Sequence, residues 1–160
     1  MIIENMSLNF FRYGFPVKFS LICMVMLCSI SLMAQDNNLV VIGNQSGTPT
    51  EIKMNELKAV FRGQRQRWGD GTKVVIAMIK TTTPLGNEIS EKIYSMNGDG
   101  VRGFWAGISF AGKFDPPNVF NTESEVEIFV SQNPGAIAIL DRVTNIPDVK
   151  TILVSGKKTF

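Results

Sequence analysis

The sequence has no histidine and only two cysteines in 160 residues. Cys23 and Cys28 lie in one apolar stretch near the N-terminus, so the chain from residue 36 onward contains neither residue type. Disulfide bonds, cysteine nucleophiles, zinc sites of cysteine and histidine, and histidine-based triads are therefore excluded from that part. Because the commonest catalytic side chains are missing, we expect no enzyme, no metal and no other cofactor. A site that uses serine and lysine stays open, although no pattern points to one.

The N-terminal segment has the features of an export signal. Arg12 and Lys18 precede an apolar stretch, residues 19–34, that carries no charge. This stretch is short for a membrane span, which needs about 20 apolar residues, and it ends at the small residue Ala34. We predict a secretory signal peptide over residues 1–35 and a mature protein in the periplasm. An uncleaved N-terminal anchor is the alternative.

The remainder of the chain is almost neutral and has the size of one domain. The sequence contains 16 lysines and arginines and 14 aspartates and glutamates; without Arg12, Lys18 and Glu4, 14 and 13 remain. This balance argues against a general polyanion binder, so we expect no nucleic-acid partner. A chain of about 125 residues suits a single hydrophobic core, and we assign residues 36–160 to one domain.

Apolar runs alternate with helical patterns along this domain. Buried or half-buried strands are predicted at residues 39–42, 73–79, 136–140 and 151–154. Helices are predicted over residues 54–61, after the cap Thr83, after the cap Asp99, and after the capping box of Thr122 and Glu125. This order predicts an α/β fold in which helices flank a mostly parallel sheet.

The most suggestive polar segment follows the second predicted strand. It consists of Lys80, Thr81, Thr82 and Thr83. One ammonium group and three hydroxyls thus stand directly before a helix N-terminus, where free N–H groups and the helix dipole favour an anion. We hypothesise a small-oxyanion site here. The plainer interpretation, equally supported, is that Thr83 is only a helix cap.

A second polar segment follows the first predicted strand. Asn44 and Ser46 offer an amide and a hydroxyl group there. Ligands of parallel sheets bind beyond the carboxyl ends of the strands, so we expect these two side chains to assist the same oxyanion site. An ordinary polar turn is the alternative.

Three arginines, Arg62, Arg65 and Arg67, form a dense basic patch between the first helix and the second strand. Arginine suits planar oxyanions, but a cluster in a loop is more often a solvated surface or a partner contact. We therefore treat these arginines as candidate partner contacts and leave direct ligand contact open. Trp68 and Trp105 are expected in the core.

Three motifs, in this order, resemble the phosphate-binding-protein-like domains of phosphate ABC transporters. The first is a helix, a phenylalanine, a glycine, a tryptophan and an aspartate-glycine turn before a strand, matched by Phe61, Gly63, Trp68, Asp70 and Gly71. The second is matched by Trp105, Phe110, Gly112, Pro116 and Pro117. The third is matched by Asn133, Pro134, Gly135, Ala136 and Ile137. Together they extend over most of the predicted domain.

The resemblance implies a periplasmic-binding-protein type II fold. Full members of the family have two lobes that close around phosphate and feed an ABC permease, whereas this chain has room for one lobe. Where the family has a serine-glycine-threonine turn that opens a helix at the phosphate site, this chain has Thr82, Thr83 and Pro84. The family's arginine a few residues earlier is absent, because Ile79 and Lys80 stand there.

The leading hypothesis is an exported module that binds a small oxyanion, phosphate by resemblance, in connection with ABC-type transport. The alternative is a non-catalytic interaction or sensory module of the cell envelope that has lost ligand binding and contacts an envelope protein. The missing arginine and the basic patch favour this alternative.

Overall fold

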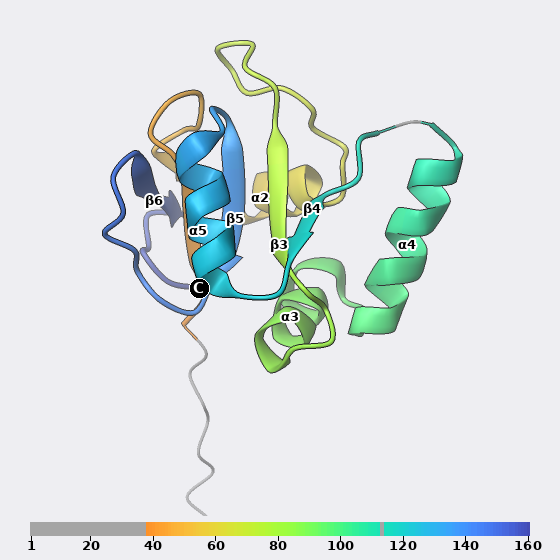
Figure 1. Cartoon of the computed structure of the whole chain (residues 1–160). Helices are drawn as coiled ribbons and strands as arrows, with labels where there is room; N and C mark the ends of the chain where they lie inside the picture. Colours follow the sequence, from red (N-terminus) through yellow and green to blue (C-terminus); the bar gives the residue numbers. More distant parts are fainter. Residues whose placement is uncertain (1–37, 113) are drawn as a thin grey trace, which may run out of the picture. The chain divides into compact units, whose positions relative to one another are not determined.

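The computed structural model describes residues 38–112 and 114–160 (Figure 1). The predicted signal peptide, with Cys23 and Cys28, lies outside the described residues. The compact unit described below begins at Asn37. Within the described residues, no helix has both the length and the apolar character that a membrane span requires.

A six-stranded sheet forms the centre of this unit, in the order β2-β6-β1-β5-β3-β4. The strands are β1 Val40–Asn44, β2 Glu51–Ile52, β3 Val75–Ile79, β4 Asn118–Phe120, β5 Ala136–Leu140 and β6 Val149–Val154. Three of the five neighbouring pairs are parallel, namely β2 with β6, β5 with β3, and β3 with β4. β1 runs antiparallel to both of its neighbours, β5 and β6. The predicted α/β fold with a mostly parallel sheet is confirmed, and β1 is its antiparallel member.

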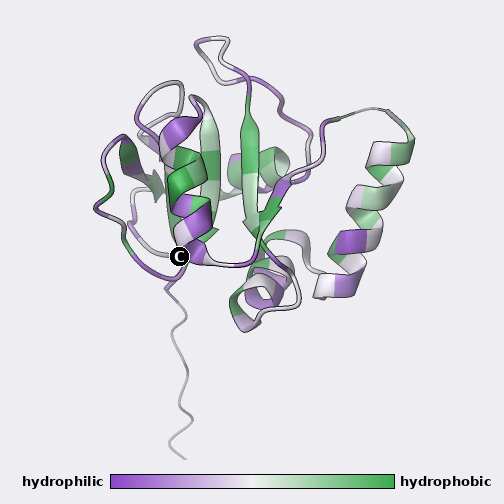
Figure 2. Ribbon diagram, in the orientation of Figure 1, coloured by the Kyte–Doolittle hydropathy of each residue, from purple (hydrophilic) through white to green (hydrophobic). Residues whose placement is uncertain are grey.

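Helices cover both faces of the sheet. They are α2 Met54–Phe61, α3 Pro84–Ile89, the π-helix η1 Ser90–Tyr94, α4 Gly98–Phe110 and α5 Glu123–Gln132. Figure 1 shows α5 in front of the sheet and α2 behind it, while α4 stands beside the edge strand β4. In Figure 2 the strands β3 and β5 are hydrophobic along their length, as expected of strands buried on both faces.

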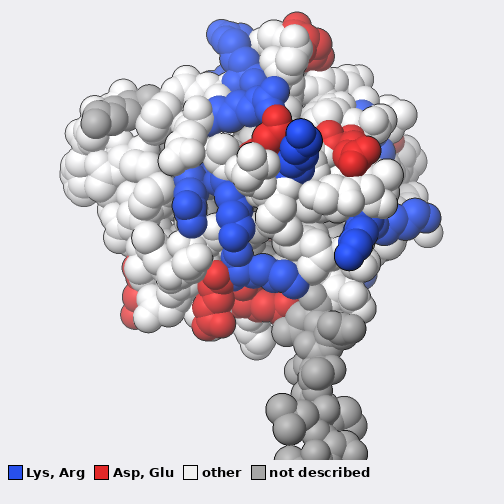
Figure 3. Space-filling view, turned by 180° about the vertical axis from the view of Figure 1, so that it is seen from behind, with Lys and Arg blue, Asp and Glu red and all other residues white. Residues whose placement is uncertain are grey.

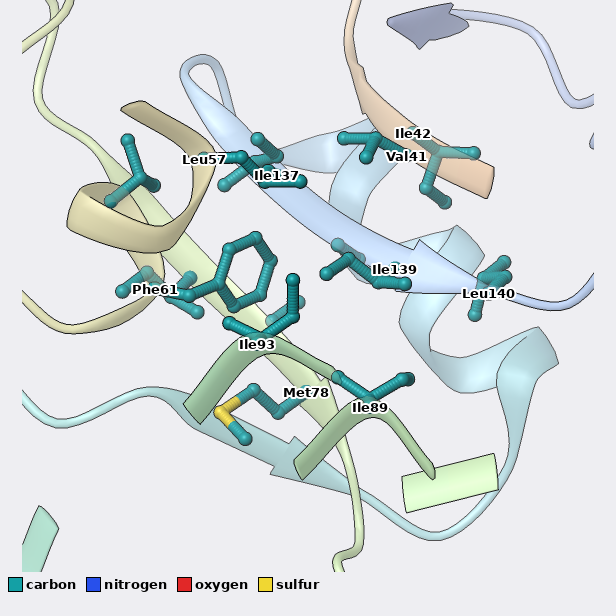
Figure 4. Packing of buried hydrophobic residues seen from close by; sticks show 14 of the residues in the cluster. Val41, Ile42, Leu57, Phe61, Met78, Ile89, Ile93, Ile137, Ile139 and Leu140 are labelled. Carbon is teal, nitrogen blue, oxygen red and sulfur yellow. The ribbon is translucent and has the colours of Figure 1, made fainter. Parts of the chain in front are cut away.

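The core between α2 and the sheet is built from aliphatic and aromatic side chains (Figure 4). Leu57 and Phe61 of α2 and Ile93 of η1 point toward Ile137 and Ile139 of β5. All five are at most 2 % exposed. Trp68 and Trp105 are also buried, as predicted. Burial of this kind contributes roughly 25 cal/mol per Å² of apolar surface, so this layer is a main source of stability.

Two of the three helix caps predicted from the sequence are confirmed. Thr83 caps α3, and Thr122 with Glu125 forms the predicted capping box of α5. The predicted cap Asp99 is wrong, because α4 begins earlier and the Oδ1 atom of Asn97 accepts from the Gly100 amide at 2.8 Å. Asp99 instead lies in the first turn, where its negative charge favours the helix start.

Two helix starts pack closely against the turn that follows β3. The Lys80 carbonyl oxygen and the Thr81 backbone occupy the space that a Cβ atom at Gly86 would need. The Thr81 carbonyl oxygen likewise occupies the space that a Cβ atom would need at Gly98, the first residue of α4. Only glycine lets the backbones approach this closely. These two glycines therefore set the positions of α3 and α4 relative to the end of β3.

We predict that Gly86→Ala destabilises the protein by about 1–3 kcal/mol, because the new methyl group must displace backbone atoms. Gly103→Ala is the matched control, since Gly103 is also helical and a Cβ there meets nothing within 4 Å. We expect the control to be neutral or to stabilise by up to ~1 kcal/mol. Urea unfolding of both variants measures the difference. Equal unfolding free energies for the two variants would contradict the proposed packing constraint.

Candidate functional site

The segment Lys80–Thr83 forms the turn between β3 and α3. The Lys80 amide donates to the Phe120 carbonyl at 2.8 Å, and the Lys80 carbonyl accepts from the Thr83 amide at 3.0 Å. The Thr83 hydroxyl accepts from the Gly86 amide at 3.0 Å and donates to the Lys80 carbonyl at 2.8 Å. The capping interpretation of Thr83 is therefore confirmed, and its hydroxyl is engaged within the turn.

The other side chains of this turn differ in exposure. Thr81 is buried at 8 % exposure, and its Oγ1 atom has no hydrogen-bond partner within the described part of the chain. Lys80 and Thr82 are exposed. Of the three hydroxyls, only that of Thr82 is thus both unengaged and open to solvent among the described contacts.

A hollow with a volume of about 480 Å³ lies beside this turn, where β3 and β5 end. It is lined by Ile79, Thr83, Pro84, Leu85, Asn121, Thr122, Glu123, Ser124, Asp141 and Arg142. We call it the β3–β5 end hollow. The N-termini of α3 and α5 both open onto it, because Thr83 and Thr122 are their caps. It therefore has the position at which α/β sheets bind ligands, beyond the carboxyl ends of parallel strands.

Backbone donors are available in this hollow. The first N–H groups of a helix have no partner within the helix. The side-chain caps engage the amides of Gly86 and Glu125. No acceptor within the described residues is assigned to the amides of Leu85 or Ser124. Two helix N-termini thus offer free donors, and the positive ends of their dipoles favour negative charge.

The charged side chains of the hollow work against a strongly negative ligand. The Arg142 guanidinium lies 3.2 Å from the Glu123 carboxylate and 3.3 Å from the buried Glu127 carboxylate. Burial, and next the negative charge of Asp141, raise the pKa of Glu123 above its ordinary value, although Arg142 acts in the opposite direction. Three carboxyl groups therefore face one guanidinium. A ligand that keeps a proton suits this hollow better than a dianion does.

The expectation that Asn44 and Ser46 share this site is wrong. β1 is antiparallel to β5, and β5 is parallel to β3, so the carboxyl end of β1 lies at the amino end of β3. The Ser46 carbonyl accepts from the Gly135 amide at 2.9 Å, and the Gly135 carbonyl accepts from Val75, the first residue of β3. Ser46 and the β3–α3 turn are thus separated by the length of β3, about 15 Å.

Asn44 has a different role at its own end of the sheet. Its side-chain amide donates to the carbonyls of Val130 and Ser131, at 2.8 and 2.9 Å, near the C-terminus of α5. Its Oδ1 atom accepts from the Ser46 amide at 2.8 Å. The side chain is buried and ties β1 to α5. Asn44 is therefore a structural residue in this fold.

The three arginines of the basic patch bind groups of their own chain. Arg62 donates to the carbonyls of Ile93 and Tyr94 at the end of η1, at 3.2 and 3.1 Å. Arg65 lies 3.5 Å from the Glu56 carboxylate, and Arg67 donates to the Gly71 carbonyl at 2.9 Å. Arg62 thus acts as a helix-end cap, whereas Arg65 and Arg67 remain accessible.

In Figure 3 lysine and arginine side chains run from the top of the view to its lower part, and acidic side chains lie among them in the upper part and again near the lower edge. This distribution is compatible with a partner contact. The structure contains no partner chain, so the partner-contact interpretation of Arg62, Arg65 and Arg67 stays a prediction.

Sequence reasoning missed Asn121, Ser124, Asp141 and Arg142 as members of the hollow. A usable signal existed for two of them, since Asp141 and Arg142 directly follow the predicted strand over residues 136–140. The rule that ligands bind beyond strand ends applies to that strand as well. The family resemblance implied an arginine at the end of β3, where Ile79 and Lys80 stand. Arg142 is an arginine at the same edge of the sheet, but it follows β5.

Comparison with known proteins gives a fold likeness. No family model matches this sequence, and no curated protein matches it. An ABC-type phosphate transport receptor from Vibrio cholerae is similar in structure, with a TM-score of 0.53, 17 % identity, and 77 % of this chain and 48 % of the receptor covered. A protein from Clostridium perfringens, described as a phosphate ABC transporter substrate-binding protein and solved with bound phosphate, gives a TM-score of 0.50.

The second comparison has 12 % identity and covers 75 % of this chain and 46 % of the other. This chain therefore spans about half the length of both receptors. At these identities the likeness establishes the fold, and it confirms the periplasmic-binding-protein-like architecture that the three sequence motifs predict.

We predict that Glu123→Gln stabilises the protein at pH values above the folded-state pKa of Glu123 and has less effect below it. The pKa of Glu123 is raised in the folded state. The folded form thus favours the protonated carboxyl, and this contribution is present in acid and is lost as the pH rises through the folded-state pKa. Urea unfolding of wild type and variant across the pH range measures the effect. Glu88→Gln, on α3, is the control; a benefit of Glu123→Gln that is independent of pH would contradict the prediction.

Proposed function

We propose that this chain is an exported solute-binding module that takes a small oxyanion in the β3–β5 end hollow. The observation that carries the proposal is the convergence of two helix N-termini, those of α3 and α5, on one hollow at the carboxyl ends of β3 and β5. Such a site binds anions through backbone amides and helix dipoles. Both similar structures are described as phosphate receptors, which makes phosphate the first ligand to test and supports binding over catalysis.

The donors divide into three groups. The amides of Leu85 and Ser124 supply hydrogen bonds from the two helix starts. The hydroxyls of Thr82 and Ser124 add neutral donors that can rotate to suit the ligand. The Arg142 guanidinium can donate two parallel hydrogen bonds to two oxygen atoms of one oxyanion.

The remaining residues of the turn have supporting roles in this proposal. Thr83 fixes the start of α3 through its cap, and Thr81 fills the interior behind the turn. The Lys80 ammonium is exposed on the same turn and adds positive potential at longer range.

In this proposal, the carboxyl groups near Arg142 determine which protonation state of the anion binds. Glu123 has a raised pKa, and its protonated form can donate a hydrogen bond to an oxyanion oxygen. A monobasic anion avoids the repulsion that a dianion meets from Asp141 and Glu127. We therefore expect binding to be stronger at mildly acidic than at mildly alkaline pH.

In this unit the proposed site contacts the anion from one side only. The hollow is open, so one side of a bound anion faces solvent, and affinity should be modest. A second wall would have to come from another protein or another copy of the chain. We propose delivery to an ABC permease as the physiological setting, by analogy with the two receptors.

A second candidate function is a non-catalytic interaction or sensory module without a small ligand. The observation that favours it is the excess of carboxyl groups around Arg142. In this case Arg142 would be held by Glu123 and Glu127 as part of the fold and would have no free donors for an oxyanion.

Isothermal titration of residues 36–160 with phosphate at low salt tests the proposal, with sulfate as the second anion. We expect saturable binding with a Kd between ~1 mM and ~1 μM. Arg142→Gln and Ser124→Ala should each weaken it, the first by about tenfold or more, because a charge-assisted hydrogen bond is lost. Ser46→Ala is the matched control, since that serine lies at the opposite end of the sheet, and it should bind as wild type does.

Two results would decide against the proposal. Absence of both heat and thermal stabilisation with either anion, in a folded protein, would favour the interaction module. Binding that Ser46→Ala abolishes and Arg142→Gln leaves unchanged would place the anion at the other end of the sheet.

A further inference from the structure

An apolar hollow separates α4 from the edge strand β4. It has a volume of about 350 Å³ and is lined mainly by carbon atoms. Its lining residues include Met78, Val101, Trp105, Ala106, Pro117 and Val119. α4 itself is held to the rest of the unit through Val101 and Trp105, which are 1 % and 6 % exposed. The hollow is thus bounded by a fixed helix on one side and a strand on the other.

Two further hollows continue this one past Pro116, which lines all three. Ser109 is shared by the first and third hollows, and Phe114 by the second and third. The second and third have volumes of about 270 and 360 Å³. We call these three adjoining hollows together the α4–β4 groove; Arg65 and Arg67 of the basic patch line one end and Lys80 lines the other.

Large apolar side chains are exposed at the groove and next to it. Val119, the middle residue of β4, lines the groove and is 57 % exposed. Phe110, which follows the lining residue Ser109 at the end of α4, is 94 % exposed. Large apolar groups gathered in one exposed region mark a binding surface more often than chance, because their exposure to water is unfavourable. The backbone of β4 is also open on this side, since β4 is the last strand of the sheet and its inner edge pairs with β3.

Cationic side chains outnumber carboxylates in the lining of the groove. Five cations line it, namely Arg65, Arg67, Lys73, Lys80 and Arg102, against the single carboxylate Asp115. Asp115 pairs with Lys73 at 2.5 Å, and Asp99 pairs with Arg102 at 2.7 Å. Arg67 and Lys80 have no ion pair among the described residues, so the groove keeps a positive excess at both of its ends.

We propose that the α4–β4 groove binds an extended acidic segment of a partner protein. Its apolar side chains lie against Ala106, Pro117 and Val119 in the apolar hollow between α4 and β4. Its carboxylates meet Lys80 and Arg102 beside that hollow and Arg67 at the far end of the groove. The free edge of β4 offers main-chain groups at Val119 for strand-like pairing, and Pro116 and Pro117 limit that pairing to a short stretch.

A peptide fits these features better than a nucleic acid does. A single-stranded nucleic acid needs aromatic faces on which its bases stack. Trp105 is buried at 6 % exposure, and Phe114, the other aromatic residue of the lining, is half-buried. The groove therefore offers no series of open rings on which successive bases could stack. The hollow between α4 and β4 is apolar and has Lys80 and Arg102 in its lining, which suits a leucine-like side chain next to acidic ones.

The test is selection of about twelve-residue peptides from a random library on the full chain. The selected peptides should be enriched in aspartate and glutamate placed among apolar residues. Fluorescence anisotropy with the strongest peptide then measures affinity for variants. We expect Val119→Asn, and separately Arg67→Gln with Arg102→Gln, to weaken binding at least about tenfold through lost apolar contact and lost ion pairing.

Matched controls lie elsewhere on the surface. Val143→Asn is the control for Val119→Asn, because Val143 is 54 % exposed and lies outside the groove. Lys157→Gln with Lys158→Gln is the control for the arginine pair, since both lysines are exposed and outside the groove. All four variants should unfold at the wild-type urea concentration.

Three outcomes would overturn the proposal. One is a selection that yields peptides without acidic enrichment. Another is loss of affinity in the control variants equal to that in the groove variants. The third is displacement of the peptide by a twelve-nucleotide single-stranded DNA at similar concentration, since the groove would then select charge alone. None of these readouts depends on phosphate binding.

Discussion

The contact between the β3–α3 turn and two glycines is the constraint on which both proposed sites depend. Gly86 and Gly98 allow the Lys80 and Thr81 carbonyls to pack directly against the starts of α3 and α4. α3 then leaves the sheet on the side of the β3–β5 end hollow, and α4 leaves it beside β4. One short turn thus separates the proposed ligand hollow from the proposed partner groove, and Lys80 and Thr81 of this turn line the groove while Thr83 lines the hollow.

A buried tyrosine provides the second fixed point. The Tyr94 hydroxyl donates to the Phe61 carbonyl at 2.6 Å and accepts from Nε1 of Trp105 at 3.0 Å. Burial raises the pKa of Tyr94 far above its ordinary value, so the hydroxyl remains a donor throughout the physiological range. Since Trp105 belongs to α4 and Phe61 ends α2, one hydroxyl joins two helices that contact the sheet at different places. α4 can therefore stand at the edge of the sheet and still be held firmly.

Local features of the fold could be predicted from the sequence, and features that depend on strand direction could not. The bounds of α2 and β5, the cap Thr83 and the capping box of Thr122 follow from side chains within a few residues. The direction of β1 depends on pairing with distant strands, and this is why Asn44 and Ser46 were expected at the wrong end of the sheet. The short strands β2 and β4 exist only through pairing with β6 and β3, so no local pattern marks them.

The distribution of charge connects the two sites. The carboxyl groups of Glu123 and Asp141 line the β3–β5 end hollow, and Glu127 is a further partner of Arg142, whereas the α4–β4 groove has a cationic excess on the other side of the same turn. A hollow of this composition has no excess of positive side chains to attract a dianion, so the proposed anion binding depends on backbone donors and Arg142. The groove, in contrast, can attract an acidic partner over about 8 Å, the screening length at physiological salt. Occupation of the groove by an acidic segment would lower the positive potential near Lys80, and the two sites should therefore oppose each other in binding anions.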